Sequence, residues 1–208
     1  MYGVSFNAVE LERLRVEVGE WSHKNFSGTL PKERPRIYGM LRCVAGMSEE
    51  LGELIGSGRS LAPIPFNLSD KLDAIGDICV YALDFCFTAD ISMGDVLYFD
   101  NEMCEWERSH ISVPPEDQRI VPILQEGLAY FIGKLSHHTL KQAQKIRNTE
   151  DHDFWIKHSM CHIWRLCFRL CREINGVDLS NLVRSVTNEV LKRDWSQSPD
   201  SAHEEARR

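Results

Sequence analysis

The chain has 208 residues, of which 43% are hydrophobic, so it can bury one large core or two small ones. It carries 31 acidic and 24 basic residues, a formal net charge of −7, and lacks the broad positive field that attracts duplex nucleic acid. No apolar run approaches the roughly 18–20 residues of a membrane span, and the first residues lack the apolar stretch of a signal peptide. We therefore expect a cytoplasmic protein with no duplex nucleic acid or membrane partner.

Apolar residues recur at helical spacing along most of the chain, and no stretch shows the sustained alternation of a strand. This pattern predicts an all-α fold of the helical-bundle type. Helices are expected at 7–24, from Tyr38 to Ile55, from a cap at Ser69 or Asp70 to Ala89, from Met93 to Arg108, and near 117–143, 152–174 and 178–194.

Glycine and proline separate these segments. The predicted loops are Ser27 to Pro35, the stretch holding Gly56, Gly58, Pro63 and Pro65, the linker with Val113, Pro114 and Pro115, and a polar tail from Ser196.

The chain has seven cysteines, an odd number, and none form a C-x-x-C pair. Most of them lie within apolar helical patterns, which is typical of small buried hydrophobic residues in a reducing compartment. A zinc or redox role is the alternative, but the spacing of metal ligands is missing. The cysteines in such patterns are Cys79, Cys86, Cys161, Cys167 and Cys171.

The two halves of the chain resemble each other. Residues 46–54 align with 127–135 (127 − 46 = 81), and residues 77–86 align with 162–171 (162 − 77 = 85). A four-residue loop difference reconciles the two shifts, although shared helical periodicity contributes to such matches. We therefore predict a tandem duplication, with one repeat at 1–112, a second at 116–195 and a tail at 196–208.

Acidic residues gather on two of the predicted helices of the first half. Glu49, Glu50 and Glu53 lie on one helix, and Asp73 and Asp77 lie on the next, among apolar residues. Residues three or four apart share a helix face, so antiparallel packing would press these carboxylates together. Such crowding is unfavourable without a cation, and Mg²⁺ prefers carboxylate oxygens. The alternative is a solvated acidic helix face.

These motifs resemble those of the MazG-type all-α nucleoside triphosphate pyrophosphohydrolases. The most specific likeness is Glu49-Glu-Leu-Gly-Glu-Leu54 followed by Asp73-Ala-Ile-Gly-Asp77. Patchier likenesses extend it over about residues 9–195: Trp21-Ser-His-Lys-Asn-Phe26, Leu140-Lys-x-x-Gln-x-Ile-Arg147 and Lys192-Arg-Asp-Trp195.

One position departs from the family pattern, which is usually E-E-x-x-E followed by E-x-x-D. Ala74 stands three residues before Asp77, and the nearest acid is Asp73, four residues before it. One residue turns a helix by roughly 100°, yet positions i and i+4 still share a face. Asp73 is therefore expected to substitute as a ligand.

The resemblance implies hydrolysis of a nucleoside triphosphate to a monophosphate and pyrophosphate. Mg²⁺, with Mn²⁺ as a substitute, would be held by Glu50, Glu53 and Asp77, while Glu49 orients or deprotonates the attacking water. Trp21, Asn25 and Phe26 are candidates to contact the base, or else form a hydrophobic anchor at a helix end. Candidate phosphate contacts, or ordinary solvated residues, are Lys141, Lys145, Arg147, Asn188, Lys192 and Arg193.

The second half lacks the acidic residues. Tyr130, Phe131 and Lys134 align with Glu49, Glu50 and Glu53, and His158 and His162 align with Asp73 and Asp77. The two histidines are four apart on a helix and suit zinc, but no third ligand is evident. We interpret this half as a degenerate repeat that packs on the first.

Two other functions compete with the enzyme. Ala74 and the degenerate repeat favour a catalytically weak nucleotide-binding or sensor module. A helical interaction protein with an incidental acidic patch is the third reading. Homodimerisation is common in the family, and the preferred base or sugar is not encoded in these motifs.

Overall fold

The computed structural model describes residues 8–29, 32, 34–56, 68–97, 120–147 and 149–195, and within these ranges helices are joined by turns and no strand is present. This confirms the predicted all-α fold. The elements are α1 (Ala8–Phe26), the 3₁₀ turn η1 (Ser27–Thr29), α2 (Pro35–Gly56), α3 (Leu68–Ala89), α4 (Met93–Leu97), α6 (Ile120–Gln144), α7 (His152–Asn175) and α8 (Leu179–Val190).

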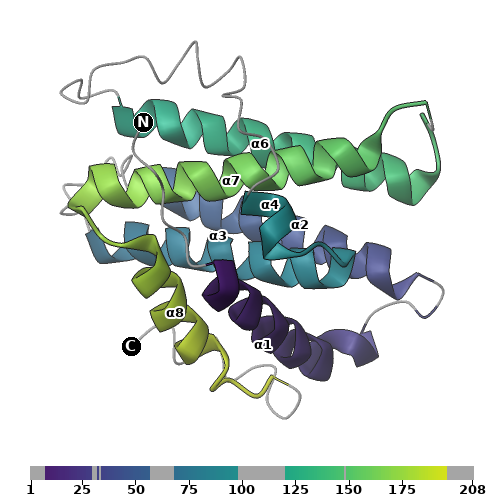
Figure 1. Ribbon diagram of the computed structural model, residues 1–208, viewed down its shortest axis with the longest axis horizontal. Coiled ribbons are helices and arrows are strands. Elements are labelled where there is room, and N and C mark those ends of the chain that lie inside the picture. The colour runs from purple at the N-terminus through teal and green to yellow at the C-terminus, as the bar shows by residue number, and fades with distance from the viewer. Residues whose placement is uncertain are drawn as a thin grey trace.

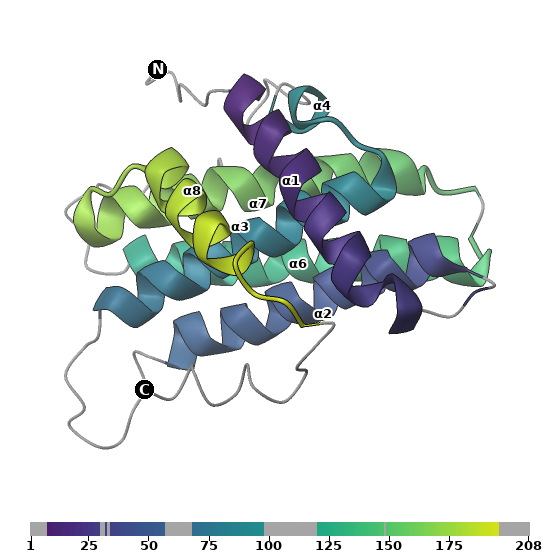
Figure 2. The same ribbon diagram turned by 90° about the horizontal axis from the view of Figure 1, so that it is seen from below.

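Four long helices form the body of the molecule (Figure 1). Helix α2 contacts α3 and α6, and α7 contacts the same two helices, so the four close into a ring. Helices α1 and α8 both cross α3 obliquely on one side of this bundle (Figure 2). The acidic segments lie on α2 and α3, and α8 crosses the second of these.

Hydrogen bonds at both ends show that α2 and α6 run antiparallel. At one end, Arg34 Nη1 donates to the carbonyl oxygen of Ala143 over 2.8 Å. At the other, Gln125 Nε2 donates to the carbonyl oxygen of Leu54 over 3.1 Å. These two bonds fix which residues of α6 lie near each part of α2.

Local sequence signals explain several helix ends. Pro35, whose ring suits a first helical turn, opens α2. Asp151 caps α7 by accepting from the Phe154 N–H, and Gly176 ends the helix at a φ of 64°. Asp178 then caps α8 by accepting from the Asn181 N–H.

Some predicted boundaries differ from the observed ones. Helix α3 begins at Leu68, so Ser69 and Asp70 lie in its first turn and do not precede it. Helix α8 ends at Val190, four residues before the predicted end at 194, and turns follow it up to Trp195. The rest of the helix expected to reach Arg108, the loop after Gly56, the linker at 113–115 and the tail from Ser196 lie outside the described residues.

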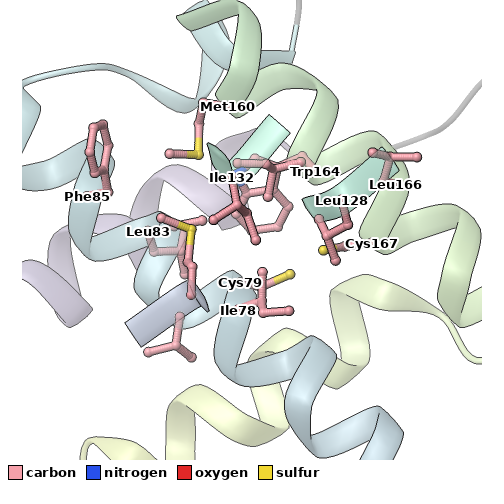
Figure 3. Packing of buried hydrophobic residues seen from close by; sticks show 14 of the residues in the cluster. Ile78, Cys79, Leu83, Phe85, Leu128, Ile132, Met160, Trp164, Leu166 and Cys167 are labelled. Carbon is pink, nitrogen blue, oxygen red and sulfur yellow. The ribbon is translucent and has the colours of Figure 1, made fainter. Parts of the chain in front are cut away.

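One cluster of buried side chains joins the helices of both predicted repeats. Trp164, Phe85 and Phe131 are its largest fully buried members, and Figure 3 shows residues of α3, α6 and α7 meeting in it. The six cysteines within the described ranges are all buried, as expected, and none of these six forms a disulfide. Burial raises the pKa of Cys86 to about 12, so this thiol remains protonated.

None of the helices in the described ranges combines the length and the apolarity that crossing a bilayer requires.

Two glycines allow α3 to pack closely on its neighbours. A Cβ at Gly46 of α2 would lie 2.4 Å from the ring of Tyr81, and one at Gly19 of α1 would lie 1.9 Å from the ring of Phe87. These contacts are closer than any side chain permits, so each glycine sets the distance between two helix axes.

We expect Gly19→Ala to destabilise the protein by about 1–3 kcal/mol, because the added methyl displaces Phe87, even though alanine has the better helix propensity. The matched control is Gly133→Ala on α6, an exposed helical site whose Cβ would meet nothing within 4 Å. That change should stabilise by about 0.5–1 kcal/mol. Urea unfolding of both variants measures the contrast, and equal effects would contradict the close approach.

Candidate functional site

Packing of α2 against α3 sets the register of the acidic residues. Arg42 of α2 pairs with Asp84 of α3, and one turn further on Gly46 receives the ring of Tyr81. The helices are antiparallel, so the next turn of α2 brings Glu50 opposite Asp77. The register that places these two carboxylates face to face therefore follows from contacts outside the acidic cluster.

The predicted carboxylates act on one another through their charges. The pKa of Glu50 is raised to about 8, first by burial and then by the charges of Asp77, Glu53, Glu49 and Asp73. Each of these four acids therefore lies close enough to disfavour the charged form of Glu50. The acidic cluster, as we call these five residues, is brought together from both helices.

Asp77 is the second perturbed carboxyl group of the acidic cluster. Burial, then the charges of Asp73 and Glu53, raises its pKa to about 6, while the nearby positive charge of Arg193 lowers it. The partly buried Glu50 and Asp77 thus lie at the base of the cluster, and the exposed Glu49, Glu53 and Asp73 lie at its rim. With no cation, Glu50 retains a proton at neutral pH.

The acidic cluster offers carboxylate oxygens, the donor type that hard divalent cations prefer. Within the described residues, however, no three of these carboxylates offer oxygen atoms that all lie within 4.8 Å of one another. Only Glu50 and Asp77 are partly buried, and a bound cation would oppose the burial and repulsion that raise their two pKa values. Asp73 influences both Glu50 and Asp77. Ala74, which occupies the glutamate position of the family pattern, is buried in the core with 2% exposure.

A buried ion pair anchors the acidic cluster to α1. The Asp84 carboxylate accepts from Arg42 and from Ser22 Oγ, the latter over 2.8 Å. Burial raises the pKa of Asp84, and the Arg42 guanidinium opposes that shift. Arg42 also lies over the ring of Phe26, 4.4 Å from its centroid. The pair therefore joins α1, α2 and α3 beside the acidic turns.

Aromatic residues from both ends of the chain meet next to this ion pair. The Phe26 ring lies edge-on to Trp21 and to Trp195, with centroid distances of 5.6 and 6.0 Å. Asn25 Oδ1 accepts from the backbone N–H of Trp195 over 2.8 Å. We call Trp21, Asn25, Phe26 and Trp195 the aromatic edge. Within the described residues, the buried Nε1 of Trp195 has no hydrogen-bond partner.

Arg193 connects the aromatic edge to the acidic cluster. Its carbonyl oxygen accepts from Trp21 Nε1 over 2.8 Å, while its side-chain charge acts on Asp77. Of the other predicted phosphate contacts on this side, Lys192 pairs with Glu189 over 2.7 Å and Asn188 is exposed on α8. Arg193 is therefore the predicted cation that the fold brings to the carboxylates.

The basic residues around Lys141 lie elsewhere. Lys141 is 16 residues beyond Gln125 along α6 (141 − 125 = 16), about 24 Å at 1.5 Å per residue. Gln125 bonds the end of α2 that carries the acidic cluster, so Lys141, Lys145 and Arg147 lie towards the opposite end. A cavity of about 220 Å³ lies there too, with Arg36, Asp90, Asp153 and Lys157 among its lining residues.

Residues aligned with the acidic cluster also meet in the second half. Phe131, aligned with Glu50, stacks on His162, aligned with Asp77, at a centroid distance of 4.4 Å and an angle of 19°. His158 Nε2 lies 3.2 Å from His162 Nε2. No third metal-binding side chain joins this histidine pair within the part of the chain that the structure describes.

Two residues of the site were not singled out from sequence. Burial, followed by the charges of Glu50, Asp77 and Glu49, raises the pKa of Tyr81 to about 12. Tyr81 follows Asp77 by four residues, so its place on the same helix face was a usable signal. Trp195 belongs to the Lys192-Arg-Asp-Trp195 motif, but its contact with Phe26 depends on how α1 meets the residues that follow α8.

A scan against family models, a search of the curated proteins and a search of the solved structures found no match.

The raised pKa of Glu50 gives a prediction about stability and pH. Folding favours the protonated form, so the metal-free protein should lose stability as pH rises from about 4.5 to about 8. In EDTA at pH 8.5, Glu50→Gln should therefore raise Tm by about 2–6 °C, with little effect at pH 4. Thermal unfolding at both pH values measures this.

The control for that experiment is Glu20→Gln, at an exposed position of α1. It should leave Tm unchanged at either pH. A Glu50→Gln effect of the same size at pH 4 and pH 8.5 would show that the substitution acts through packing, and would contradict a titrating Glu50.

Proposed function

We propose that the protein is a Mg²⁺-dependent nucleotide pyrophosphohydrolase that converts an NTP or dNTP to the monophosphate and pyrophosphate. The observation that carries the proposal is the convergence of Glu50 and Asp77, with three further carboxylates, across α2 and α3. Such a donor set suits a hard cation bound together with substrate phosphates. The resemblance of these motifs to MazG-type enzymes supports the same reaction.

In this proposal the carboxylates have separate roles. Glu50, Glu53 and Asp77 hold the metal, with Asp73 as a further ligand. The ion would supply charge neutralisation at the phosphates. Glu49, exposed at the rim, orients or deprotonates the attacking water.

The aromatic edge is the proposed place for the nucleoside. Aromatic side chains stack on any base, and the indole N–H of Trp195 is a buried donor without a partner among the described residues. Arg193 lies between this edge and Asp77, so it is placed to contact phosphates that extend towards the metal. The competing reading remains that the edge only anchors the helix end.

We further propose that the α6–α7 hairpin is the degenerate counterpart of α2–α3. The support is that Phe131 stacks on His162, while the aligned Glu50 and Asp77 lie close enough for the charge of Asp77 to raise the pKa of Glu50. An aromatic stack occupies the place of the carboxylates. Because Lys141 and Arg147 lie far from the acidic cluster of their own chain, they would contact phosphate only across a homodimer.

Pyrophosphate release from a panel of NTPs and dNTPs, with Mg²⁺ and with EDTA, tests the activity. Glu53→Gln should lower kcat/KM at least about 100-fold, because an exposed metal ligand is lost while the core is untouched. Glu126→Gln, at an exposed site on α6, is the matched control and should keep full activity.

Other outcomes select the alternatives. Nucleotide binding without turnover in Mg²⁺ or Mn²⁺ would favour the sensor module. Absence of turnover, of nucleotide binding and of metal-dependent stabilisation would favour the helical interaction protein.

Substitution of Arg193 distinguishes substrate contact from structural anchoring. Arg193→Ala leaves the backbone carbonyl that bonds Trp21, so the aromatic edge should persist. We expect KM for the triphosphate to rise about 10-fold through loss of a charged contact worth about 1.5 kcal/mol, with Tm within about 2 °C of wild type. Lys192→Ala, whose side chain pairs with Glu189, should change KM little. Equal KM values for wild type and Arg193→Ala would remove Arg193 from the substrate site.

A further inference from the structure

A second group of metal-binding side chains lies at the turn between α6 and α7. His137 and His138 come from the last third of α6, Glu150 from the turn, and His152 is the first residue of α7. This group, which we call the histidine turn, lies near the end of α6 that is remote from the acidic cluster. The proposed nucleotide site does not use it.

The distances within the histidine turn are those of a metal-binding group. One ligand atom from each of His137, His138 and Glu150 can be chosen so that all three lie within 4.8 Å of one another. His138 Nδ1 is 4.0 Å from Glu150 Oε2 and 3.1 Å from His152 Nδ1. Zn–N bonds of about 2.0–2.1 Å in a tetrahedron place ligand atoms about 3.3 Å apart, so the 3.1 and 4.0 Å separations at His138 lie near those of a tetrahedral site.

The Nδ1 atoms of His138 and His152 lie 3.1 Å apart. In the metal-free protein one imidazole can donate its N–H to the other, and the same separation brings both nitrogens within reach of one ion when neither carries a proton there. The other nitrogen of His152, Nε2, lies 3.3 Å from the carbonyl oxygen of Ile146, which orients the ring. Metal-bound imidazoles are commonly held by such a bond from the second nitrogen.

Packing holds the central ring of the group in place. His138 is 4% exposed and stacks on Trp155, with a centroid distance of 5.7 Å and an interplanar angle of 12°. A ligand that is already immobile loses little conformational entropy when an ion binds. Trp155 also provides an optical signal next to the group.

The backbone of the turn points Glu150 back towards the helices. Lys145 and Arg147 both adopt positive φ, 54° and 56°, which is uncommon for residues with a side chain. The Glu150 N–H then donates to the Arg147 carbonyl, and the His152 N–H donates to the Glu150 carbonyl. Such a conformation persists where surrounding contacts hold it, and it brings the carboxylate to the histidines.

From this geometry we infer a zinc site at the histidine turn, with His137, His138, Glu150 and His152 as ligands. Three imidazoles and one carboxylate suit a first-row transition metal such as Zn²⁺, whereas Mg²⁺ prefers oxygen ligands alone. Four protein ligands correspond to a structural site, so the ion joins the end of α6 to the start of α7. The inference holds whether or not the acidic cluster hydrolyses nucleotides.

Titration of untagged, EDTA-treated full-length protein with Zn²⁺ in a calorimeter tests the inference. Wild type should bind one ion at the histidine turn, and Co²⁺ should give the visible absorption of a four-coordinate site. Zinc at 100 times Kd should raise Tm by about 5–10 °C. His138→Ala should weaken binding at least about 100-fold, and Glu150→Gln at least about 10-fold.

Glu150→Gln keeps the test valid if His138→Ala fails to fold, because Glu150 is partly exposed in the turn. His158→Ala, which removes a member of the other histidine pair on α7, should bind zinc as wild type does. Glu53→Gln should also leave this binding unchanged, which separates it from any zinc held by the acidic cluster. Wild-type affinity in Glu150→Gln, or loss of binding in His158→Ala or Glu53→Gln instead, would overturn the inference.

Discussion

The close approach of α2 and α3 is the constraint on which the rest of the structure depends. Gly46 admits the ring of Tyr81 between the two helix axes, and the Arg42–Asp84 ion pair fixes their register one turn away. With that register, Glu50 and Asp77 face each other even though their negative charges repel. The favourable burial of the neighbouring core residues stabilises an arrangement that the carboxylates alone would oppose.

The acidic cluster and the histidine turn differ in how they tolerate the absence of an ion. Burial and four neighbouring acids raise the pKa of Glu50, so without an ion this carboxyl group keeps its proton at neutral pH. In the histidine turn, a neutral imidazole can donate to its neighbour, and the Ile146 carbonyl receives the remaining contact. Carboxylates without a proton or cation repel, while paired imidazoles have a hydrogen-bonded metal-free state.

Helical periodicity predicted the faces of the helices but not how distant helices meet. The carboxylates of α2 and α3 were predictable because i, i+4 spacing groups them on one face of each helix and the two helices follow one another in the chain. Trp195 and the His138–His152 contact depend on crossing angles and on a turn with positive φ, which no spacing rule encodes. Lys141 was grouped with the phosphate contacts because its charge is visible in the sequence, whereas its position along α6 is not.

The aromatic edge has a consequence for the order of events during synthesis. Trp21 and Asn25 bond to Arg193 and Trp195, across separations of 172 and 170 residues. Helices α2 and α3 can pack on each other once residue 89 has emerged from the ribosome. The aromatic edge can form only after residue 195 has emerged. Loop closure over such a length is slow relative to local pairing. In a nascent chain, Trp21 and Phe26 therefore lack their contacts with Arg193 and Trp195 until residue 195 has emerged from the ribosome.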